Sequence, residues 1–358
     1  MTEELLDDLT RRFAFHATIY RGTTLENSSP LYAHLSTYVS TDKDILQLVL
    51  DADRATQVSN LLFGAVHYLL LQGEDHPLRE FYASLTLQPN APEDAAPAFR
   101  DFCLAHSQQI QELVTTRKVQ TNEVGRCTGL LPAFSLIYRR TQRTPLSLIE
   151  IGSSAGLHLL WDKYGYDYDH VARIGDRTSE VQLHCSLLGE GIPDLPDQMP
   201  SIRFRIGIDI DPIDIENAEE VRWLRALIWP EQTDRAALFE RAIHIVRRDP
   251  PPIVAGNAAD VLPSVLTRVP KDTVLCIFHS YTLNQCPANI RGEILRKVEE
   301  VAKSRDLFRI SLEWYGGQQQ PYLELNSYTS RQVDHELLAY CESHGRSIEW
   351  LSGTFLMK

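Results

Sequence analysis

The chain has 358 residues, of which 43% are hydrophobic, so it is long enough for two domains and a sizeable buried core. Its 48 acidic and 35 basic residues give a formal net charge of −13. A general nucleic-acid binder needs an excess of Lys and Arg to replace counterions, so this balance argues against that class. The six cysteines are scattered without a C-x-x-C pair, and no short-range ligand spacing occurs, so we expect a reducing environment and no metal site.

The sequence has no feature that predicts export or membrane insertion. MTEELLDDLTRRF at the N-terminus is acidic and lacks the basic and apolar regions of a signal peptide. The most apolar segment, LLFGAVHYLLL at 61–71, is too short to span a bilayer, and its His67 is expected in a core or at a domain interface. We therefore expect a soluble, cytoplasmic protein, and the sequence leaves its oligomeric state open.

The first part of the chain is predicted to be helical. Residues 1–143 have the three- and four-residue apolar spacing of helices, and no strand is predicted before Leu146. One helix is expected over 99–117, and another over 121–140 with a kink at Pro132. We expect residues 1–143 to form a helical cap domain on the rest of the chain.

From residue 144 onward, apolar runs alternate with helical segments. This alternation is typical of a doubly wound, mostly parallel, Rossmann-like sheet. Five strands are predicted, at 146–152, 204–212, 252–263, 273–283 and 308–317. The segment 330–345 is predicted as a helix between two terminal strands. Residues 161–203 are too long for a normal crossover, and we expect an insertion there that contains a hairpin.

Polar residues follow the predicted strands. Ligands of open parallel sheets bind beyond the carboxyl ends of the strands, so these residues are candidates for a site. In chain order they are Glu150 with the glycine turn after it, Asp209, Asn257, His279-Ser280-Tyr281 and Glu313.

The turn Gly152-Ser153-Ser154-Ala155-Gly156 fits two templates. As G-x-S-x-G it resembles the elbow that presents the nucleophilic serine of α/β-hydrolases, and His279 follows Ser154 in hydrolase order. As an acid followed by G-x-x-x-G it is a strand-to-helix turn of the kind that holds a nucleotide. The hydrolase elbow needs preceding strands and an oxyanion loop, which the first 143 residues do not provide, so we favour the second template.

The order of these motifs resembles the class I S-adenosylmethionine-dependent methyltransferases. Glu150-x-Gly152-x-x-x-Gly156 is similar to their first motif, and Gly207-Ile208-Asp209 to their second strand, whose terminal acid binds the ribose hydroxyls. Gly256-Asn257-Ala258 resembles the third motif, which lies beside adenine. The chain departs from the pattern in its long insertion, in Asn257 where Asp is usual, and in Ser154 where the middle glycine is usual.

The resemblance implies S-adenosylmethionine as the cofactor. It also implies the cofactor-binding residues, which are Glu150, Gly152, Ser154, Gly156, Asp209, Asn257 and Ala258. The whole chain is also similar to a bacterial family of unknown function with a methyltransferase-like core. Five segments carry that similarity: SPLYAHL, LLFGAVHYLLL, VQTNEVGR, EIGSSAGLHLLWDKYGYDY and RWLRALIWPEQTDR.

Further residues are candidates for catalysis or substrate binding. His279 can exchange a proton near neutral pH, and Glu313 is an acid at the next strand end, so either is a candidate proton acceptor; a structural hydrogen bond is the simpler interpretation of each. The polar tract QTNEVGR could be a helix cap, or it could reach the ligand. The residues expected to contact substrate are Asn122, Glu123, Arg126 and Tyr281.

The sequence thus predicts an S-adenosylmethionine-dependent methyltransferase that acts on a small-molecule acceptor. Two alternatives stay open: a serine hydrolase that uses Ser154, and a non-catalytic ligand-binding protein with a methyltransferase-like fold. The sequence does not identify the methyl acceptor.

Overall fold

The computed structural model describes residues 2–22, 28–52, 57–120, 122–169, 171–315, 320–330 and 332–351. The chain divides into two compact units. A helical unit contains residues 1–121 together with 216–239, and a sheet unit contains residues 122–215 together with 240–358. The fold is α/β, with a helical N-terminal region and one large mixed sheet.

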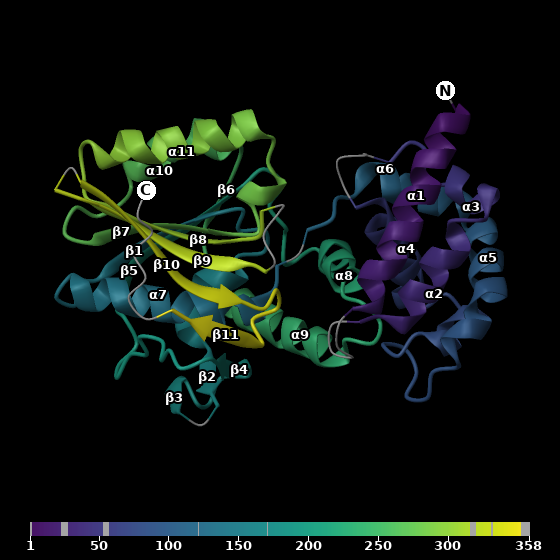
Figure 1. The fold of residues 1–358 in the computed structure, drawn as a ribbon, viewed down its shortest axis with the longest axis horizontal. Coiled ribbons are helices and arrows are strands. Elements are labelled where there is room, and N and C mark those ends of the chain that lie inside the picture. Colours follow the sequence, from purple (N-terminus) through teal and green to yellow (C-terminus); the bar gives the residue numbers. More distant parts are fainter. Residues whose placement is uncertain are drawn as a thin grey trace. The chain divides into compact units, whose positions relative to one another are not determined.

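The helical unit is built from two separate stretches of the chain (Figure 1, purple to blue, and α8). Its elements are α1 (Thr2–Arg21), α2 (Pro30–Val39), α3 (Lys43–Gln47), α4 (Val58–Leu71), η2 (Pro77–Phe81), η3 (Pro92–Asp94), α5 (Ala95–Ala105), α6 (Ser107–Thr116) and α8 (Ala218–Ala226). The helix predicted over 99–117 is therefore two helices, which meet at His106. Helix α9 (Thr233–Arg248) crosses the division at residue 239.

Helix α4 is the centre of this unit. It is apolar around nearly its whole circumference, which is typical of a helix buried on all sides. The Phe63 ring stacks on Tyr32 of α2 at 4.5 Å between centroids. A Cβ atom at Gly64 would lie 3.0 Å from Leu227, so α4 and the residues after α8 are in close contact. The returning stretch 216–239 is thus part of the core of this unit.

His67 lies fully buried in this core, as expected for a core histidine. Its Nδ1 is 2.9 Å from the carbonyl oxygen of Ala226, which can only accept, so Nδ1 carries the proton. Nε2 then accepts from the Ser84 hydroxyl at 2.8 Å. Burial, together with the charge of Arg225, lowers the pKa of His67 to about 3.

We expect His67 to make the stability of the helical unit depend on pH. Because its pKa is lower in the folded state, the unfolded chain binds the extra proton, and stability is lost as the pH falls below about 6.5. His67 contributes at most about 1.4 kcal/mol per pH unit to the slope of the free energy of unfolding against pH. Urea unfolding gives the free energy of unfolding at pH 7 and at pH 5. The difference between these two values should be smaller for His67→Gln than for the native chain. Equal differences for His67→Gln and the native chain would contradict the prediction.

The described residues of the sheet unit form one sheet of eleven strands in the order β3-β2-β4-β11-β10-β9-β8-β7-β1-β5-β6, mostly parallel. The strands are β1 (Leu146–Ile151), β2 (Gly165–Tyr168), β3 (Ala172–Gly175), β4 (Gln182–Leu188), β5 (Ile202–Asp209), β6 (Ile253–Ala255), β7 (Val274–Ser280), β8 (Leu307–Glu313), β9 (Tyr322–Thr329), β10 (Gln332–Cys341) and β11 (Ser347–Trp350). Its helices are η4 (Val124–Arg126), α7 (Cys127–Arg140), η5 (Leu157–Lys163), α10 (Ala258–Leu266), η6 (Leu283–Gln285) and α11 (Ala288–Ala302).

Helices cover both faces of the central strands. Helices α10 and α11 pack on one face over an apolar cluster that includes Ile149, Ile208 and Ile277 (Figure 1). Helix α7 contacts β8, β9, β10 and β4 on the other face. The structure therefore groups α7 with the sheet, whereas the sequence-based boundary at residue 143 places it in the helical domain.

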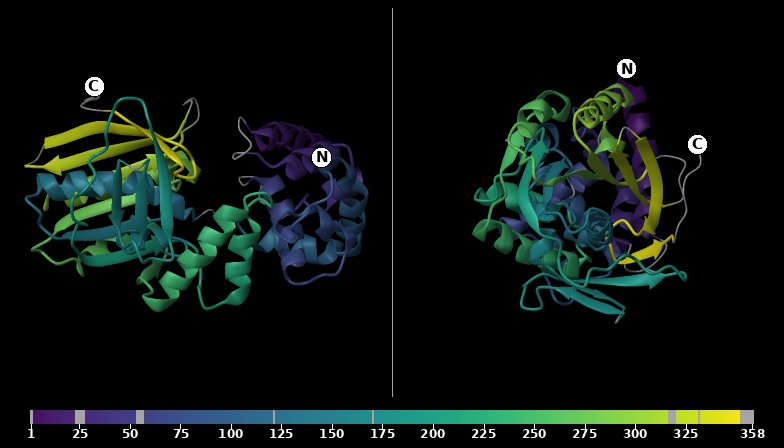
Figure 2. Two further views of the ribbon diagram at one scale, coloured as in Figure 1. Left: turned by 90° about the horizontal axis from the view of Figure 1, so that it is seen from below. Right: turned by 90° about the vertical axis from the view of Figure 1, so that its left-hand side faces the viewer.

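Two predictions for the outer strands have different outcomes. The expected insertion between β1 and β5 contains the antiparallel hairpin β2–β3, and β4 joins β11 in parallel. The helix predicted over 330–345 is wrong, because residues 332–341 form the long strand β10 in antiparallel pairing with β9 (Figures 1 and 2, yellow). Residue 331 lies outside the described residues. Gln332 pairs with Thr329, so β10 pairs with β9 from its first residue, and this pairing outweighs the helix-forming residues of the segment.

Candidate functional site

The order in which the chain adds strands to the sheet reverses between β1 and β7. The chain runs from β1 outward to β5 and β6, and then returns to the other side of β1 to form β7 and β8. Ile151 pairs with His279, so the turns that follow β1 and β7 begin next to each other. Ligands of open α/β sheets bind at such a switch point, beyond the carboxyl ends of the two strands.

The glycine turn after β1 has three residues in the left-handed region: Gly152 (φ 78°), Ser154 (φ 49°) and Gly156 (φ 76°). A Cβ atom at Gly152 would overlap the side chain of Thr282, which follows β7. At Gly156 it would lie 2.7 Å from Pro251. The two glycines thus allow close approach of neighbouring segments of the chain. The turn leads into the 3₁₀ helix η5 rather than an α-helix.

Asp209, at the end of β5, holds this turn. Its Oδ2 accepts a hydrogen bond from the backbone N–H of Ser154 at 2.7 Å, and its Oδ1 accepts one from Asp211 at 2.8 Å. Each oxygen keeps a second lone pair. Asp209 and Ser154 are therefore adjacent, as the cofactor-binding prediction requires.

Asn257 begins the helix after β6. Its Oδ1 accepts from the N–H of Ala259 at 3.0 Å, which makes it the N-cap of α10, and Ala258 is the first residue of that helix. The neighbouring Gly256 N–H donates to the carbonyl of Asp209 at 2.8 Å. Asn257 and Ala258 thus follow β6, which pairs with β5. The side-chain oxygen of Asn257 is used in the helix cap.

Glu150 and His158 form a buried pair at the end of β1. The side chains are 0% and 3% exposed, and His158 Nδ1 lies 2.8 Å from Glu150 Oε1. The other ring nitrogen, Nε2, lies 2.8 Å from the backbone carbonyl oxygen of Glu123. Burial raises the pKa of Glu150, and His158 partly offsets the rise. His158 therefore joins the glycine turn to the segment that precedes η4.

That segment supplies the other predicted substrate contacts. The Asn122 side-chain N–H donates to the carbonyl of Ser153 at 2.8 Å, inside the glycine turn. The buried Arg126 guanidinium lies 3.9 Å above the Tyr281 ring and donates to the Ser343 carbonyl. The structure thus brings Asn122, Glu123, Arg126 and Tyr281 to the ends of β1 and β7. Burial raises the pKa of Tyr281 to about 12, against the opposing charge of Arg126.

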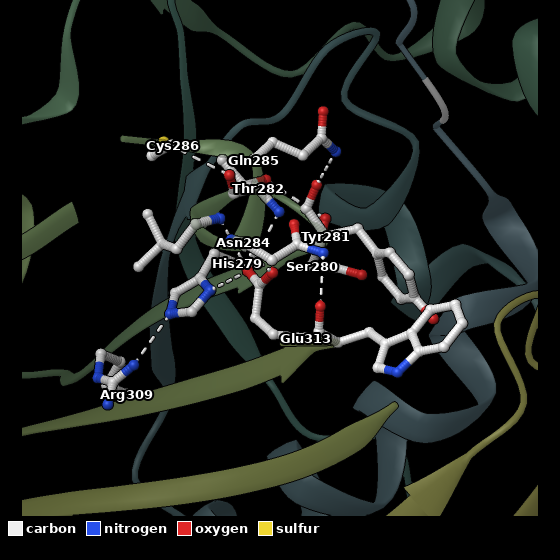
Figure 3. A network of polar contacts seen from close by, with 11 residues as sticks. His279, Ser280, Tyr281, Thr282, Asn284, Gln285, Cys286, Arg309 and Glu313 are labelled. Carbon is white, nitrogen blue, oxygen red and sulfur yellow. Dashed lines mark hydrogen bonds and ion pairs between the residues drawn. The ribbon is translucent and has the colours of Figure 1, made fainter. Parts of the chain in front are cut away.

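His279 and Glu313 form a second buried pair, shown in Figure 3, and both side chains are 0% exposed. His279 Nδ1 lies 2.6 Å from Glu313 Oε1, and His279 Nε2 lies 3.0 Å from the Arg309 guanidinium. Because a guanidinium can only donate, Nε2 accepts, and Nδ1 carries the single ring proton. Burial lowers the pKa of His279 in spite of Glu313, so the imidazole is neutral.

Glu313 also organises the turn after β7. Its two oxygens accept the backbone N–H groups of Thr282 (3.1 Å), Leu283 (3.0 Å) and Asn284 (3.1 Å), in addition to His279. Burial opposes ionisation, but these donors outweigh it and hold the pKa of Glu313 below its ordinary value. The turn so held includes Tyr281, a non-glycine residue with φ of 53°, which is a strained conformation common at functional sites.

Several buried polar atoms at these strand ends have no hydrogen-bond partner within the described part of the chain. Among them are Asn122 Oδ1, Glu150 Oε2, Ser153 Oγ, Ser280 Oγ and Asn284 Oδ1. The two asparagine orientations are defined, because each side-chain N–H donates to a carbonyl. An unsatisfied buried group costs about 1–3 kcal/mol, so native proteins rarely leave several in one place. Their concentration here marks the switch point as the candidate binding site.

Sequence reasoning missed His158, Thr282 and Asn284, and it named Ser153 and Ser280 only as members of their strand-end segments. His158 had a visible signal, since it is the one strongly polar residue in the run GLHLLW that follows the glycine turn. Thr282 and Asn284 had none, because their positions depend on how Glu313 folds the turn after β7. Among the residues that the structure describes, no three His, Cys, Asp or Glu side chains could together hold a metal ion. No helix within these residues has the length and apolar character needed to cross a bilayer.

Comparison with known proteins identifies the family of the chain. No curated protein and no solved structure matches the chain. One family matches residues 18–350, which is nearly the whole chain and includes most of both units and every candidate site residue. The chain belongs to this family, whose description reads "Uncharacterized protein conserved in bacteria (DUF2332)".

Proposed function

We propose that the chain is an S-adenosylmethionine-dependent methyltransferase that acts on a small-molecule acceptor. The observation that carries the proposal is the set of unsatisfied buried polar atoms at the switch point between β1 and β7. The strand order β6-β5-β1-β7-β8 supports it, because it directs the glycine turn, Asp209 and the turn after β7 toward one place. This is where a doubly wound nucleotide-binding fold holds its ligand.

The chemistry of the unsatisfied atoms fits this cofactor. Three of them, on Asn122, Glu150 and Asn284, are acceptors, and S-adenosylmethionine offers an ammonium, ribose hydroxyls and an adenine amine as donors. When bound, the cofactor supplies a methyl group on a sulfonium centre. The protein's contribution to such a transfer is alignment of the reactants and exclusion of water.

Asp209 fits a ribose-binding role through its remaining lone pairs. Its two backbone contacts fix the carboxylate beside Ser154, so no side-chain rearrangement is needed before it accepts further hydrogen bonds. His279 and Glu313 fit a positioning role better than that of proton acceptor. Both are fully buried, and their partners are Arg309 and the turn that presents Tyr281.

The hydrolase alternative has less support. A serine nucleophile needs a histidine within hydrogen-bond distance. The ring nitrogens of His158 contact Glu150 and the Glu123 carbonyl, and those of His279 contact Glu313 and Arg309. Neither histidine is therefore available to Ser154 in this arrangement.

Native mass spectrometry of the freshly purified protein, followed by calorimetry with S-adenosylmethionine and S-adenosylhomocysteine, tests the proposal. Binding should raise the free energy of unfolding by about 2.7 kcal/mol at a ligand concentration one hundred times Kd. Absence of binding by both compounds would contradict the proposal. Labelling of Ser154 by a fluorophosphonate would instead establish the hydrolase, and binding without turnover on any small-molecule acceptor would favour a ligand-binding protein.

Asp209→Asn is expected to weaken S-adenosylmethionine binding by about tenfold or more. The amide keeps one acceptor oxygen, but its N–H₂ group must then face a backbone N–H donor of Ser154 or Asp211, and the charge that strengthens both bonds is lost. Calorimetry gives the ratio of Kd values. Asp211→Asn removes the same charge two residues away at an exposed position and should bind nearly as the native chain does. Equal weakening by both variants would mean that only net charge matters.

A further inference from the structure

The pair of Glu150 and His158 has a defined proton content. His158 Nε2 faces the backbone carbonyl of Glu123, an obligate acceptor, so this nitrogen carries a proton. His158 Nδ1 faces Glu150 Oε1 at 2.8 Å, and this contact also needs a proton, from either the ring or the carboxyl group. Without it, a nitrogen lone pair would face a carboxylate oxygen. The geometry therefore requires one proton shared by Nδ1 and Oε1, which makes the pair neutral as a whole.

In the second histidine pair of the same sheet, by contrast, the contacts of the ring do not require a proton on both nitrogens. His279 Nε2 faces the guanidinium of Arg309, an obligate donor, so His279 needs only the proton on Nδ1. Both pairs are buried and both join a histidine Nδ1 to a glutamate oxygen. The partner of Nε2 differs, a carbonyl in one case and a guanidinium in the other, and Glu313 in addition accepts three backbone N–H groups. One pair thus holds an extra proton that the other lacks.

The other oxygen of Glu150 has the properties of a binding point. Glu150 Oε2 is buried and has no hydrogen-bond partner in the described ranges, and the same holds for Asn122 Oδ1, whose residue contacts the adjacent turn. Both atoms only accept, so the complementary ligand group is a donor or a cation. The charged groups facing Glu150 are Arg126 of η4 and Asp209 of β5, which have opposite signs, and the Cys127 thiol of α7 is also close.

We propose that the Glu150–His158 pair holds one shared proton in the ligand-free protein and releases it when a cationic ligand group binds beside Glu150 Oε2. Loss of the proton leaves Glu150 as a carboxylate that turns toward the new positive charge, so that Oε1 no longer faces the lone pair on His158 Nδ1. His158 is then neutral and still donates from Nε2 to the Glu123 carbonyl. Every atom is accounted for, since one proton leaves to solvent as one positive charge arrives. Burial favours this exchange, because an uncompensated charge at a buried site is costly.

The raised pKa of Glu150, caused first by burial, is consistent with a proton held by the pair. The proposal rests on the proposed function only for the choice of cationic probe, S-adenosylmethionine. The proposal has two halves. The ligand-free half, the shared proton in the absence of ligand, does not depend on that choice. The ligand half, release of the proton on binding, does, so each half needs its own measurement.

The ligand-free half is tested by proton NMR of the full chain. A proton shared between a buried ring nitrogen and a carboxyl oxygen gives a strongly downfield resonance, whichever atom carries it. We expect two such resonances, one from each histidine pair, and a second ring N–H resonance, from Nε2, for His158 but not for His279. Glu150→Gln and His158→Gln should each remove one of them, and the His279 resonance should persist in both variants as an internal check that they fold. Absence of a resonance that responds to both substitutions would overturn the inference, whatever the protein binds.

The ligand half is tested by calorimetry with S-adenosylmethionine in two buffers of different ionisation enthalpy. We expect release of close to one proton per site by the native chain near neutral pH, loss of the shared-proton resonance on binding, and almost no release by Glu150→Gln. Binding without proton release, or equal release by Glu150→Gln, would overturn the inference and leave the proposed cofactor in place. Failure of S-adenosylmethionine to bind would contradict the proposed function and the release step together, while the NMR result would still decide the shared proton.

Discussion

Replacement of Gly152 by alanine is expected to lower the free energy of unfolding of the sheet unit by roughly 2–4 kcal/mol. Two independent effects add. The backbone at this position has φ of 78°, which disfavours any residue with a Cβ atom. The new methyl group would also overlap the Thr282 side chain, so the turns after β1 and β7 would have to separate. Urea unfolding measures the loss, and ligand binding at the switch point should be lost with it.

Two further variants separate strain from overlap. Gly73 also has a positive φ, of 104°, but nothing lies within 4 Å of its Cβ position, so Gly73→Ala should cost only about 1 kcal/mol. In the Gly152→Ala background, Thr282→Ala removes the overlapping Oγ1 and Cγ2 atoms. It should recover roughly 1–2 kcal/mol in a double-mutant cycle. If the effects of Gly152→Ala and Thr282→Ala simply added in the double variant, the new methyl group at position 152 would not overlap the Thr282 side chain.

Glu313→Gln is expected to destabilise the sheet unit by roughly 3 kcal/mol and to loosen the turn after β7. The native carboxylate accepts hydrogen bonds from His279 and from three successive backbone N–H groups. Glutamine has one acceptor oxygen, and its N–H₂ group would face a donor. Urea unfolding gives the stability, and hydrogen exchange at residues 282–284 gives the local effect, which should be a loss of protection at all three amides.

The same substitution should change the pH dependence of stability. The pKa of Glu313 is lower in the folded state, so its contribution is present above the unfolded value of about 4.3 and is lost as the pH falls toward the folded value. The free energy of unfolding of Glu313→Gln should therefore fall less steeply with decreasing pH, below about 4.3, than that of the native chain. Glu324→Gln removes a partly buried carboxyl group of β9 whose pKa is raised by burial, so it should not make this fall less steep. If the two variants gave the same profile, the amide contacts of Glu313 would not be the cause.

The central strands could be predicted from sequence because they are short, apolar and bounded by glycine, proline or acid. The strands found at β1, β5, β6, β7 and β8 fall within or beside the five predicted runs, and each strand end carries the polar residues expected there. The resemblance to a bacterial family of unknown function was also correct, and the resemblance to methyltransferases stays a prediction. These features are local, so a single sequence contains them.

The errors arose where distant pairing decides the conformation. Residues 332–341 have helix-forming residues at helical spacing, but β9 offers a complete row of backbone partners, and β11 pairs with the far end. Helix α7 resembles the preceding helices in composition, yet it packs on the sheet. The role of His158 depends on a carbonyl 35 residues earlier in the chain. Such a contact leaves no periodic pattern in the sequence.

The divided helical unit has a consequence for the order of events during synthesis. Trp223 of α8 is buried against Tyr68 and Gly64 of α4, but it is made only after β1 to β5. At about 5–20 residues per second, the ribosome needs roughly 5 to 20 seconds to produce the intervening residues 122–215. During that interval the N-terminal helices lack part of their core. The first unit to begin folding is therefore unable to finish until much of the sheet has left the ribosome.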